Sequence, residues 1–304
     1  MNPDILHVDP NEIQRALERY DKTEEEANND IKTIQEWMKN QPHLPEIMDK
    51  VPIRNFLFLN KFNMEKTQRK IDMYYTVRGL FPDFFENSNP KLELMQKVME
   101  AVYLCVLPTA LDGIHRVFII KVNPGNVFGP RELVVHSTNV TEMRLYEDCL
   151  AAGEILIFDM TNISLSDVKK LTPTLIIKIL VIFEKVYSIR SKDIYILNSP
   201  GFVSVVLSIL KSSLKQKIFE RIQCCDDSAV LKGILSNDQL PKDYGGEGPS
   251  LHELNEMLKL KLITYEERFD SLDKLRTDES LRPKKLNKDE IFGFFGHFMK
   301  LNVD

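Results

Sequence analysis

Three short apolar runs, separated by longer stretches of helical character, constrain the fold of this chain more than any other feature. Residues 117–122, 155–158 and 194–197 are rich in β-branched and aromatic side chains, a composition typical of buried strands. Between them, residues 130–149 and 166–187 have the length and pattern of helices. This alternation predicts an α/β fold in which at least part of the sheet is parallel.

The first ninety residues contain no convincing strand and predict a small helical domain. Thr23 and Glu26 have the spacing of a capping box at the start of a long helix. Asn63 can cap a further helix. We therefore expect a helical domain in front of the α/β part.

Composition and charge exclude several classes of protein. The chain has 304 residues, of which 43% are hydrophobic and 28% charged, and its formal net charge is -5. This balance is typical of an ordinary globular protein and argues against a generic nucleic-acid binder. The first residues show no signal peptide, and the longest apolar run, residues 175–183, is interrupted by Lys178 and too short to span a bilayer. We interpret the chain as cytoplasmic.

No pattern in the sequence predicts catalysis, a metal site or a cofactor. The motifs GxGxxG, GxxxxGK[ST], GxSxG and HExxH are absent, and the six histidines are scattered. Asp159, at the end of a predicted strand, could be a catalytic acid or a metal ligand, but such a carboxylate is more often a hydrogen-bond acceptor in a loop. The spacing of the four cysteines fits neither a metal site nor a CxxC motif: Cys105, Cys149, Cys224 and Cys225. We expect them to be reduced thiols. We expect a protein that is not an enzyme.

Residues 202–222 predict a helix with an unusually wide apolar surface. Its apolar side chains cover roughly 220° of the circumference, against roughly 100° for an ordinary surface helix. One apolar stripe consists of Val203, Leu207, Leu210, Leu214 and Ile218. Such a helix is either enclosed in a large core, or it has one apolar side on a cavity and another available to a membrane surface.

Basic residues gather around the same stretch: residues 185–221 contain seven basic and two acidic side chains. Lys217 and Arg221 are four apart and would share a helix face. Arg190 and Lys192 are two apart and would point the same way from a strand. If the pairs meet, they suit the phosphate oxygens of a multiply phosphorylated headgroup. The alternative interpretation is a solvated basic surface.

The C-terminal part of the chain is polar and mixed in charge. Residues 266–304 carry nine acidic and eight basic side chains and include an apolar cluster, residues 291–295 with Phe298. We expect this segment to lie across the surface with the cluster fixing its end. The alternative is that the cluster docks a partner.

Five short motifs follow one another along the second half of the chain: ILIFD at 155–159, LTP at 171–173, IYILNSP at 194–200, KIFERI at 217–222 and LPKDYGG at 240–246. Together they resemble the CRAL-TRIO (Sec14-like) lipid-transfer family, and in particular its tocopherol- and retinaldehyde-binding branch. The segment FLFLNKFN at 56–63 is similar to the helical segment that precedes the lipid-binding domain in that family. The resemblance covers roughly residues 10–250.

The resemblance implies a helical N-terminal domain over residues 1–90, a lipid-binding α/β domain over residues 91–250 and a surface tail over residues 251–304. A mixed sheet would form the floor of an apolar cavity, and the helix that begins at Phe202 would close it as a gate. The positions that match the family's cavity lining are Leu133, Val140, Phe158, Ile179, Phe183, Ile189, Ile194, Val206 and Ile209.

The resemblance also implies a phosphoinositide site, because the four basic positions that bind a headgroup in tocopherol-type proteins fall on Arg190, Lys192, Lys217 and Arg221. The chain departs from the family at Phe58 and Asn60, where arginines are usual, and at His136 and Val140, where small residues are common. Ligand identity therefore cannot be copied from a relative.

We accordingly predict a monomeric cytoplasmic carrier of one small hydrophobic molecule of tocopherol, retinoid or carotenoid type. It would use no cofactor, bind no nucleic acid and contact phosphoinositide-containing membranes transiently. His136 would be a hydrogen-bond partner of the ligand. The alternatives are a phospholipid exchanger and a scaffold with a filled core that binds only protein.

Overall fold

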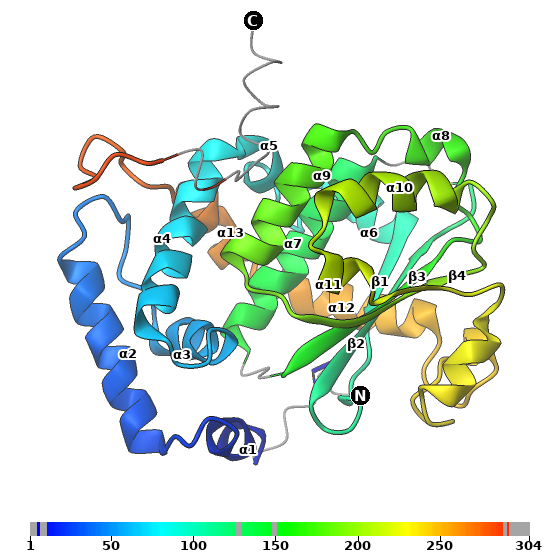
Figure 1. Cartoon of the computed structure of the whole chain (residues 1–304), viewed down its shortest axis with the longest axis horizontal. Coiled ribbons are helices and arrows are strands. Elements are labelled where there is room, and N and C mark those ends of the chain that lie inside the picture. Colours follow the sequence, from blue (N-terminus) through cyan, green and yellow to red (C-terminus); the bar gives the residue numbers. More distant parts are fainter. Residues whose placement is uncertain (1–4, 7–10, 126–128, 148–150, 288–290, 292–304) are drawn as a thin grey trace, which may run out of the picture.

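The computed structural model describes residues 5–6, 11–125, 129–147, 151–287 and 291, and it places a group of helices beside a five-stranded sheet (Figure 1). The helices that precede the sheet are α1 (Glu12–Glu18), α2 (Glu24–Lys39), α3 (Lys50–Leu59), α4 (Met64–Leu80), α5 (Pro82–Phe85) and α6 (Glu93–Ala101). The predicted capping box is present at the start of α2, where the Glu26 amide donates to Thr23 Oγ1 at 3.2 Å. Asn63 caps α4 by accepting from the Lys66 amide at 2.9 Å. The predicted helical character of this part is confirmed.

The sheet is mixed, and its strands follow one another in chain order. They are β1 (Val102–Val106), β2 (His115–Val122), β3 (Gly153–Asp159), β4 (Ser191–Leu197) and β5 (Ile222–Cys224). Strand β1 is antiparallel to β2, whereas β2, β3, β4 and β5 are mutually parallel. The α/β fold with a partly parallel sheet is therefore confirmed, and β1 and β5 are strands that the sequence did not predict.

Alternate side chains of the sheet belong to different apolar clusters, as the strand period requires. Ile155 and Ile157 on β3 lie in a cluster that Leu251 and Leu254 complete from α12 (Leu251–Ile263). Leu156, between them, is half-buried and packs against the main cluster instead. The main cluster is shared with α4 and with the helices that follow the strands, and it joins the helical part to this side of the sheet.

The helices that connect the strands are shorter than predicted. They are α7 (Pro130–Tyr146), α8 (Leu165–Val168), α9 (Pro173–Leu180), the π-helix η1 (Val181–Val186), α10 (Val203–Ser213) and α11 (Gln216–Phe219). The helix predicted over residues 130–149 ends at Tyr146, and Cys149 lies outside the described residues. A single helix over residues 166–187 is wrong, because Pro173 begins a new helix that Thr172 caps by accepting from the Leu175 amide at 3.2 Å.

A single helix over residues 202–222 is also wrong. Helix α10 ends at Ser213, and Leu214 and Lys215 are extended, with ψ of 150° and 138°. After the short α11 the chain enters β5, where the Ile194 amide donates to the Arg221 carbonyl at 3.0 Å. Pairing with β4 therefore overrides the local helical pattern, and the stripe predicted through Leu214 and Ile218 does not exist on one helix.

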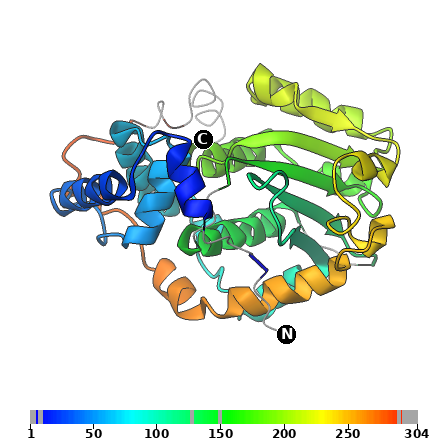
Figure 2. The same cartoon turned by 90° about the horizontal axis from the view of Figure 1, so that it is seen from below.

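The chain after β5 continues through η2 (Ser228–Gly233), η3 (Lys242–Tyr244), α12 and α13 (Glu266–Leu272). Helix α12 packs on β1, and four of its five leucines, Leu251, Leu254, Leu258 and Leu262, are fully buried. Figure 2 shows α12 in orange and α10 in yellow-green on opposite sides of the strands. The predicted domain boundaries stay predictions, but the segment that begins at residue 251 contributes to the core before it reaches the surface.

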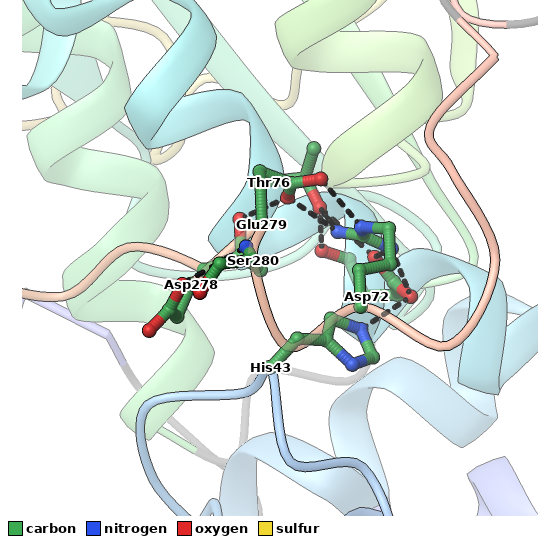
Figure 3. Close-up of polar contacts among 8 residues, drawn as sticks. His43, Asp72, Thr76, Asp278, Glu279 and Ser280 are labelled. Carbon is green, nitrogen blue, oxygen red and sulfur yellow. Dashed lines mark hydrogen bonds and ion pairs between the residues drawn. The ribbon is translucent and has the colours of Figure 1, made fainter.

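Residues 276–286, here called the C-terminal strap, cross the helical part beside Asp72 and Thr76 of α4 (Figure 3). Arg282 holds them there. The Arg282 guanidinium donates to both carboxylate oxygens of Asp72 on α4, at 2.8 and 2.9 Å, and to Thr76 Oγ1 at 2.7 Å. His43 Nε2 lies 3.0 Å from the same carboxylate, and the His43 carbonyl accepts from the Asp278 amide at 2.9 Å. The strap is thus tied to both α4 and the loop before α3. The predicted Phe cluster lies outside the described residues apart from Ile291, which is buried.

Candidate functional site

Helix α10 is apolar but largely unburied. Among its described side chains only Val203 is buried, and Val205 is 50% exposed. Val206, Leu207 and Leu210 are half-buried, and α10 packs mainly against α9. A helix enclosed in a large core is therefore not what the structure contains. The second interpretation, an apolar helix with a side open to its surroundings, fits.

The predicted ligand residues come from six elements around the side of the sheet that faces α7 and α9. Leu133, His136 and Val140 lie on α7, Phe158 on β3, Ile179 on α9, Phe183 on η1, Ile189 just before β4, Ile194 on β4 and Val206 on α10, while the side chain of Ile209 lies outside the described part. Leu133, Ile179, Phe183 and Ile189 all pack against the main apolar cluster and remain half-buried. The predicted ligand residues are hereafter called the apolar wall, and the structure leaves this wall incompletely covered.

Two residues of the same kind were missed by the sequence analysis. Ile120 on β2 and Leu156 on β3 are half-buried and pack against the main cluster. Leu156 stands two residues from the predicted Phe158 on β3, so strand alternation could have identified it. Ile120 is paired with Phe158 in the register of β2 and β3, which the sequence does not show. The larger cavity, of about 490 Å³, lies elsewhere, between α4 and the C-terminal strap, and none of the predicted ligand residues lines it. A small cavity of about 40 Å³ includes Ile189 and Arg190 in its lining.

His136 differs from the rest of the apolar wall because it is polar and buried, with 1% of its surface exposed. Neither ring nitrogen has a hydrogen-bond partner among the described residues. Burial lowers the pKa of His136 from 6.5 to about 4, so the imidazole is neutral at physiological pH. A buried polar group without a partner costs about 1–3 kcal/mol, and an uncharged ligand group that hydrogen-bonds to the ring would remove that cost.

The junction of α10 and α11 is linked to the π-helix by an ion pair. Lys215, at the extended break, pairs with the carboxylate of Glu184 on η1. The backbone carbonyl of Glu184 in turn accepts from Lys70 of α4, and burial lowers the pKa of Lys70 to about 8. Glu184 of η1 therefore connects the segment that follows α10 with helix α4.

The four predicted headgroup cations divide into two that are engaged and two that are exposed. Arg190 donates to Tyr20 Oη at 3.0 Å and to the backbone carbonyls of Phe58 and Leu59 at the end of α3. The partial negative charge at the C-terminal end of a helix also stabilises a cation in that place. Lys192 is exposed on β4 and Lys217 is exposed on α11.

Arg221 lies directly before β5 rather than on a helix, so the prediction that Lys217 and Arg221 share a helix face is wrong. Its guanidinium donates to the carbonyl of Ser191, the residue between Arg190 and Lys192. The β4–β5 pairing thus brings Arg221 to the Arg190 and Lys192 pair, which spacing alone could not establish. Lys217 lies four residues before Arg221, on α11.

Asp159 is an acceptor in a structural network, as the more ordinary interpretation predicted. Its carboxylate accepts from Asn198 Nδ2 at 2.8 Å and Tyr244 Oη at 3.0 Å and pairs with Lys121 at 2.9 Å. Burial acts to raise the pKa of Asp159, but hydrogen bonds from Thr161, Lys121 and Asn198 outweigh it and lower the pKa to about 2. Over the described ranges no group of three or more His, Cys, Asp or Glu side chains could hold a metal ion. No helix in that same part of the chain is long and apolar enough to cross a membrane.

Comparison with known proteins assigns the two parts of the fold. Residues 114–246 match the CRAL/TRIO domain, and residues 23–95 match the Pinta-like UBA domain. The chain therefore contains a CRAL/TRIO domain, the domain of a family of lipid-binding transfer proteins. Within that family it lies near the tocopherol transfer branch, and the recognition made from the sequence motifs is confirmed.

The relatives are distant but cover most of the chain. The alpha-tocopherol transfer protein-like protein of Homo sapiens is 25% identical over 247 residues, which are 79% of this chain and 71% of that protein. Clavesin-1 of Xenopus laevis is 22% identical over 262 residues, 80% of this chain and 74% of its own length. The crystal structure of Sfh5 superposes with a TM-score of 0.46 at 15% identity, over 82% of this chain and 93% of that one.

Proposed function

We propose that this protein is a cytoplasmic, non-enzymatic carrier that holds one small hydrophobic molecule of tocopherol, retinoid or carotenoid type and transfers it to or from membranes. The observation that carries the proposal is the apolar wall together with α10, whose apolar side chains are half-buried or exposed. A ligand between them would cover both. Burying about 400 Å² of apolar ligand surface contributes on the order of 10 kcal/mol before the costs of ordering and opening.

His136 supports a ligand with one uncharged polar group, such as a hydroxyl or carbonyl. A neutral imidazole can donate to a carbonyl oxygen or exchange a hydrogen bond with a hydroxyl. It offers no positive charge to a phosphate, because its pKa of about 4 lies well below physiological pH. This favours an isoprenoid alcohol, aldehyde or ketone over a phospholipid as the molecule in the cavity.

Release would be promoted by a phosphoinositide at the membrane. Lys192, Lys217 and the Arg190–Arg221 pair around Ser191 would bind the headgroup, while the exposed side of α10 enters the interface. Binding at the membrane then favours the conformation in which α10 is separated from the apolar wall, which is a shift in population rather than a new contact with the ligand.

Native mass spectrometry of the purified protein, followed by organic extraction, tests the carrier. A co-purified isoprenoid or retinoid of 1:1 stoichiometry is the expected result. A co-purified phospholipid would instead establish an exchanger. Failure to bind any of these lipids, added singly at micromolar concentration, would leave only the protein scaffold.

Vesicle transfer tests the trigger. Charge reversal of Lys192 and Lys217 to glutamate should abolish the stimulation of transfer by phosphoinositide and leave ligand affinity unchanged. Lys39→Glu with Lys97→Glu is a matched control, because both lysines are exposed and lie on α2 and α6. If the reversed pair transfers as well as the control, the phosphoinositide mechanism is wrong.

A further inference from the structure

Arg19, at the end of α1, lies beside the headgroup cations although it is about 170 residues away from them in sequence. Its guanidinium stands over the ring of Phe58, 5.8 Å from the centroid. The neighbouring Tyr20 packs edge-on against the same ring, with centroids 5.3 Å apart, and accepts the hydrogen bond from Arg190. Phe58 and Tyr20 therefore hold Arg19 and Arg190 on the same small region of surface.

The starts of β2, β3 and β4 meet next to this region, at Gly153. A Cβ atom placed on Gly153 would lie 3.0 Å from the Arg190 carbonyl, 3.5 Å from His115 Cδ2 and 3.7 Å from Lys192 Cβ. His115 is paired with Gly153 in the register of β2 and β3. His115, Arg190 and Lys192 thus surround one point at the N-terminal ends of the parallel strands β2, β3 and β4.

The electrostatics of His115 connect Arg19 to this point. Burial lowers the pKa of His115, and the charges of Lys192 and Arg19 lower it further, whereas Asp112 and Asp193 oppose them. Exposed charges are largely screened beyond a Debye length of about 8–10 Å. Because Arg19 and Lys192 both lower the pKa of the same imidazole, both cations lie near His115. The guanidinium of Arg221 donates to the carbonyl of Ser191, the residue between Arg190 and Lys192.

We propose that Arg19 is a further cation of the headgroup site, which is then formed jointly by the end of helix α1 and the N-terminal ends of the parallel strands. The inference rests on the proposed phosphoinositide function and deepens it. With Arg19 added to Arg190, Lys192 and Arg221, the site suits a membrane lipid whose headgroup carries two or more phosphates, because separate phosphates can then engage cations from both parts of the fold. His115 reports on the occupied site without being required for it.

Affinity measurements test the inference. Arg19→Ala should weaken binding to soluble inositol 1,4,5-trisphosphate by about fivefold, the effect of one cation near an anionic partner, and should weaken binding to vesicles with 5% phosphatidylinositol bisphosphate similarly. Arg19→Lys should restore most of the affinity. Lys39→Ala is the matched control, because it removes one exposed charge from the far end of α2, about 24 Å along that helix.

The titration of His115 by NMR provides a readout that a general loss of stability would not produce. The free Arg19→Ala protein should show a higher pKa for His115 than the unaltered protein, because one repelling charge is gone. Addition of inositol trisphosphate should raise the pKa of His115 in the unaltered protein, since an anion near the ring favours the imidazolium. A His115→Gln variant identifies the signal.

The outcomes separate this inference from the function on which it rests. If the unaltered protein binds neither the trisphosphate nor the vesicles, both the trigger and the role of Arg19 are wrong. If Lys192→Ala weakens binding but Arg19→Ala behaves like Lys39→Ala, the role of Arg19 alone is wrong. Weaker binding of Arg19→Ala to vesicles with unchanged binding of the soluble headgroup would also overturn it, since Arg19 would then act on the membrane surface and not in the site.

Discussion

Glu142 on α7 joins the helical part of the molecule to the lipid-binding part, and its removal should be severely destabilising. Its carboxylate accepts from Tyr74 Oη at 2.8 Å, from Tyr187 Oη and from the Arg78 guanidinium. The side chains of Glu142 and Arg78 are each only 3% exposed. Because Glu142→Ala leaves the Arg78 charge buried without its carboxylate, we expect a loss of about 3–5 kcal/mol. That is a large fraction of the roughly 5–15 kcal/mol typical of a folded domain.

Urea unfolding followed by circular dichroism measures this loss, with Glu65→Ala as the control. Glu65 also pairs with an arginine, Arg69 at 3.7 Å, but both side chains are more than two-thirds exposed, at 86% and 71%, and its removal should cost less than about 1 kcal/mol. The double variant Glu142→Leu with Arg78→Met removes both charges and should recover most of the loss. If Glu142→Ala costs less than about 1 kcal/mol, or the double variant is as unstable as the single one, the buried charge is not the cause.

The further predictions concern three other residues, two of them buried and one that holds the C-terminal strap. His136→Leu should stabilise the ligand-free protein by about 1 kcal/mol in urea titrations and weaken the binding of a hydroxyl-bearing ligand. Because the pKa of His136 is lowered from 6.5 to about 4, the unaltered protein should lose up to about 3 kcal/mol as the pH falls from 6.5 to 4, and the leucine variant should lack this loss. The pKa of Asp159 is lowered from 3.8 to about 2, so its contribution of about 2 kcal/mol should be present above pH 3.8 and disappear towards pH 2, and Asp159→Asn should show no such dependence. Arg282→Ala should release the C-terminal strap and speed its cleavage in limited proteolysis, and an unchanged cleavage rate would show that Arg282 does not hold it.

The strands that the sequence predicted are those whose side chains carry the information by themselves. Residues 117–122, 155–158 and 194–197 are central or nearly central in the sheet, and their apolar, β-branched runs record that burial. Strand β1 was missed because it follows α6 directly, with no turn residue between Ala101 and Val102. Strand β5 has three residues, of which Gln223 and Cys224 are exposed, so neither length nor alternation marks it.

The parts of the site that sequence motifs mark could be predicted. The parts that depend on contacts between segments far apart in the sequence could not. The apolar wall was found from a motif resemblance, and the structure places its described members around one side of the sheet. The grouping of Arg221 with Arg190 depends on the pairing of β5 with β4, which overrides the helical pattern of residues 202–222. Arg19 could not be found from the sequence, because its position is fixed by the ring of Phe58.

The magnitudes at α10 indicate which force sets the position of that helix. The ion pair of Glu184 with Lys215 is solvent-exposed on the lysine side, at 68%, and such pairs contribute about 0–1 kcal/mol. By contrast, Val205, Val206, Leu207 and Leu210 are exposed or half-buried, and covering four aliphatic side chains fully contributes on the order of 5 kcal/mol. Apolar burial therefore outweighs the ion pair in setting the position of α10. Either a ligand with the apolar wall or a membrane interface can cover these side chains, so the equilibrium of α10 depends on which of the two is present. In the mechanism that we propose, a headgroup that holds the protein at the membrane would change that choice without touching the ligand, so cations near β4 would act on the position of α10 from a distance.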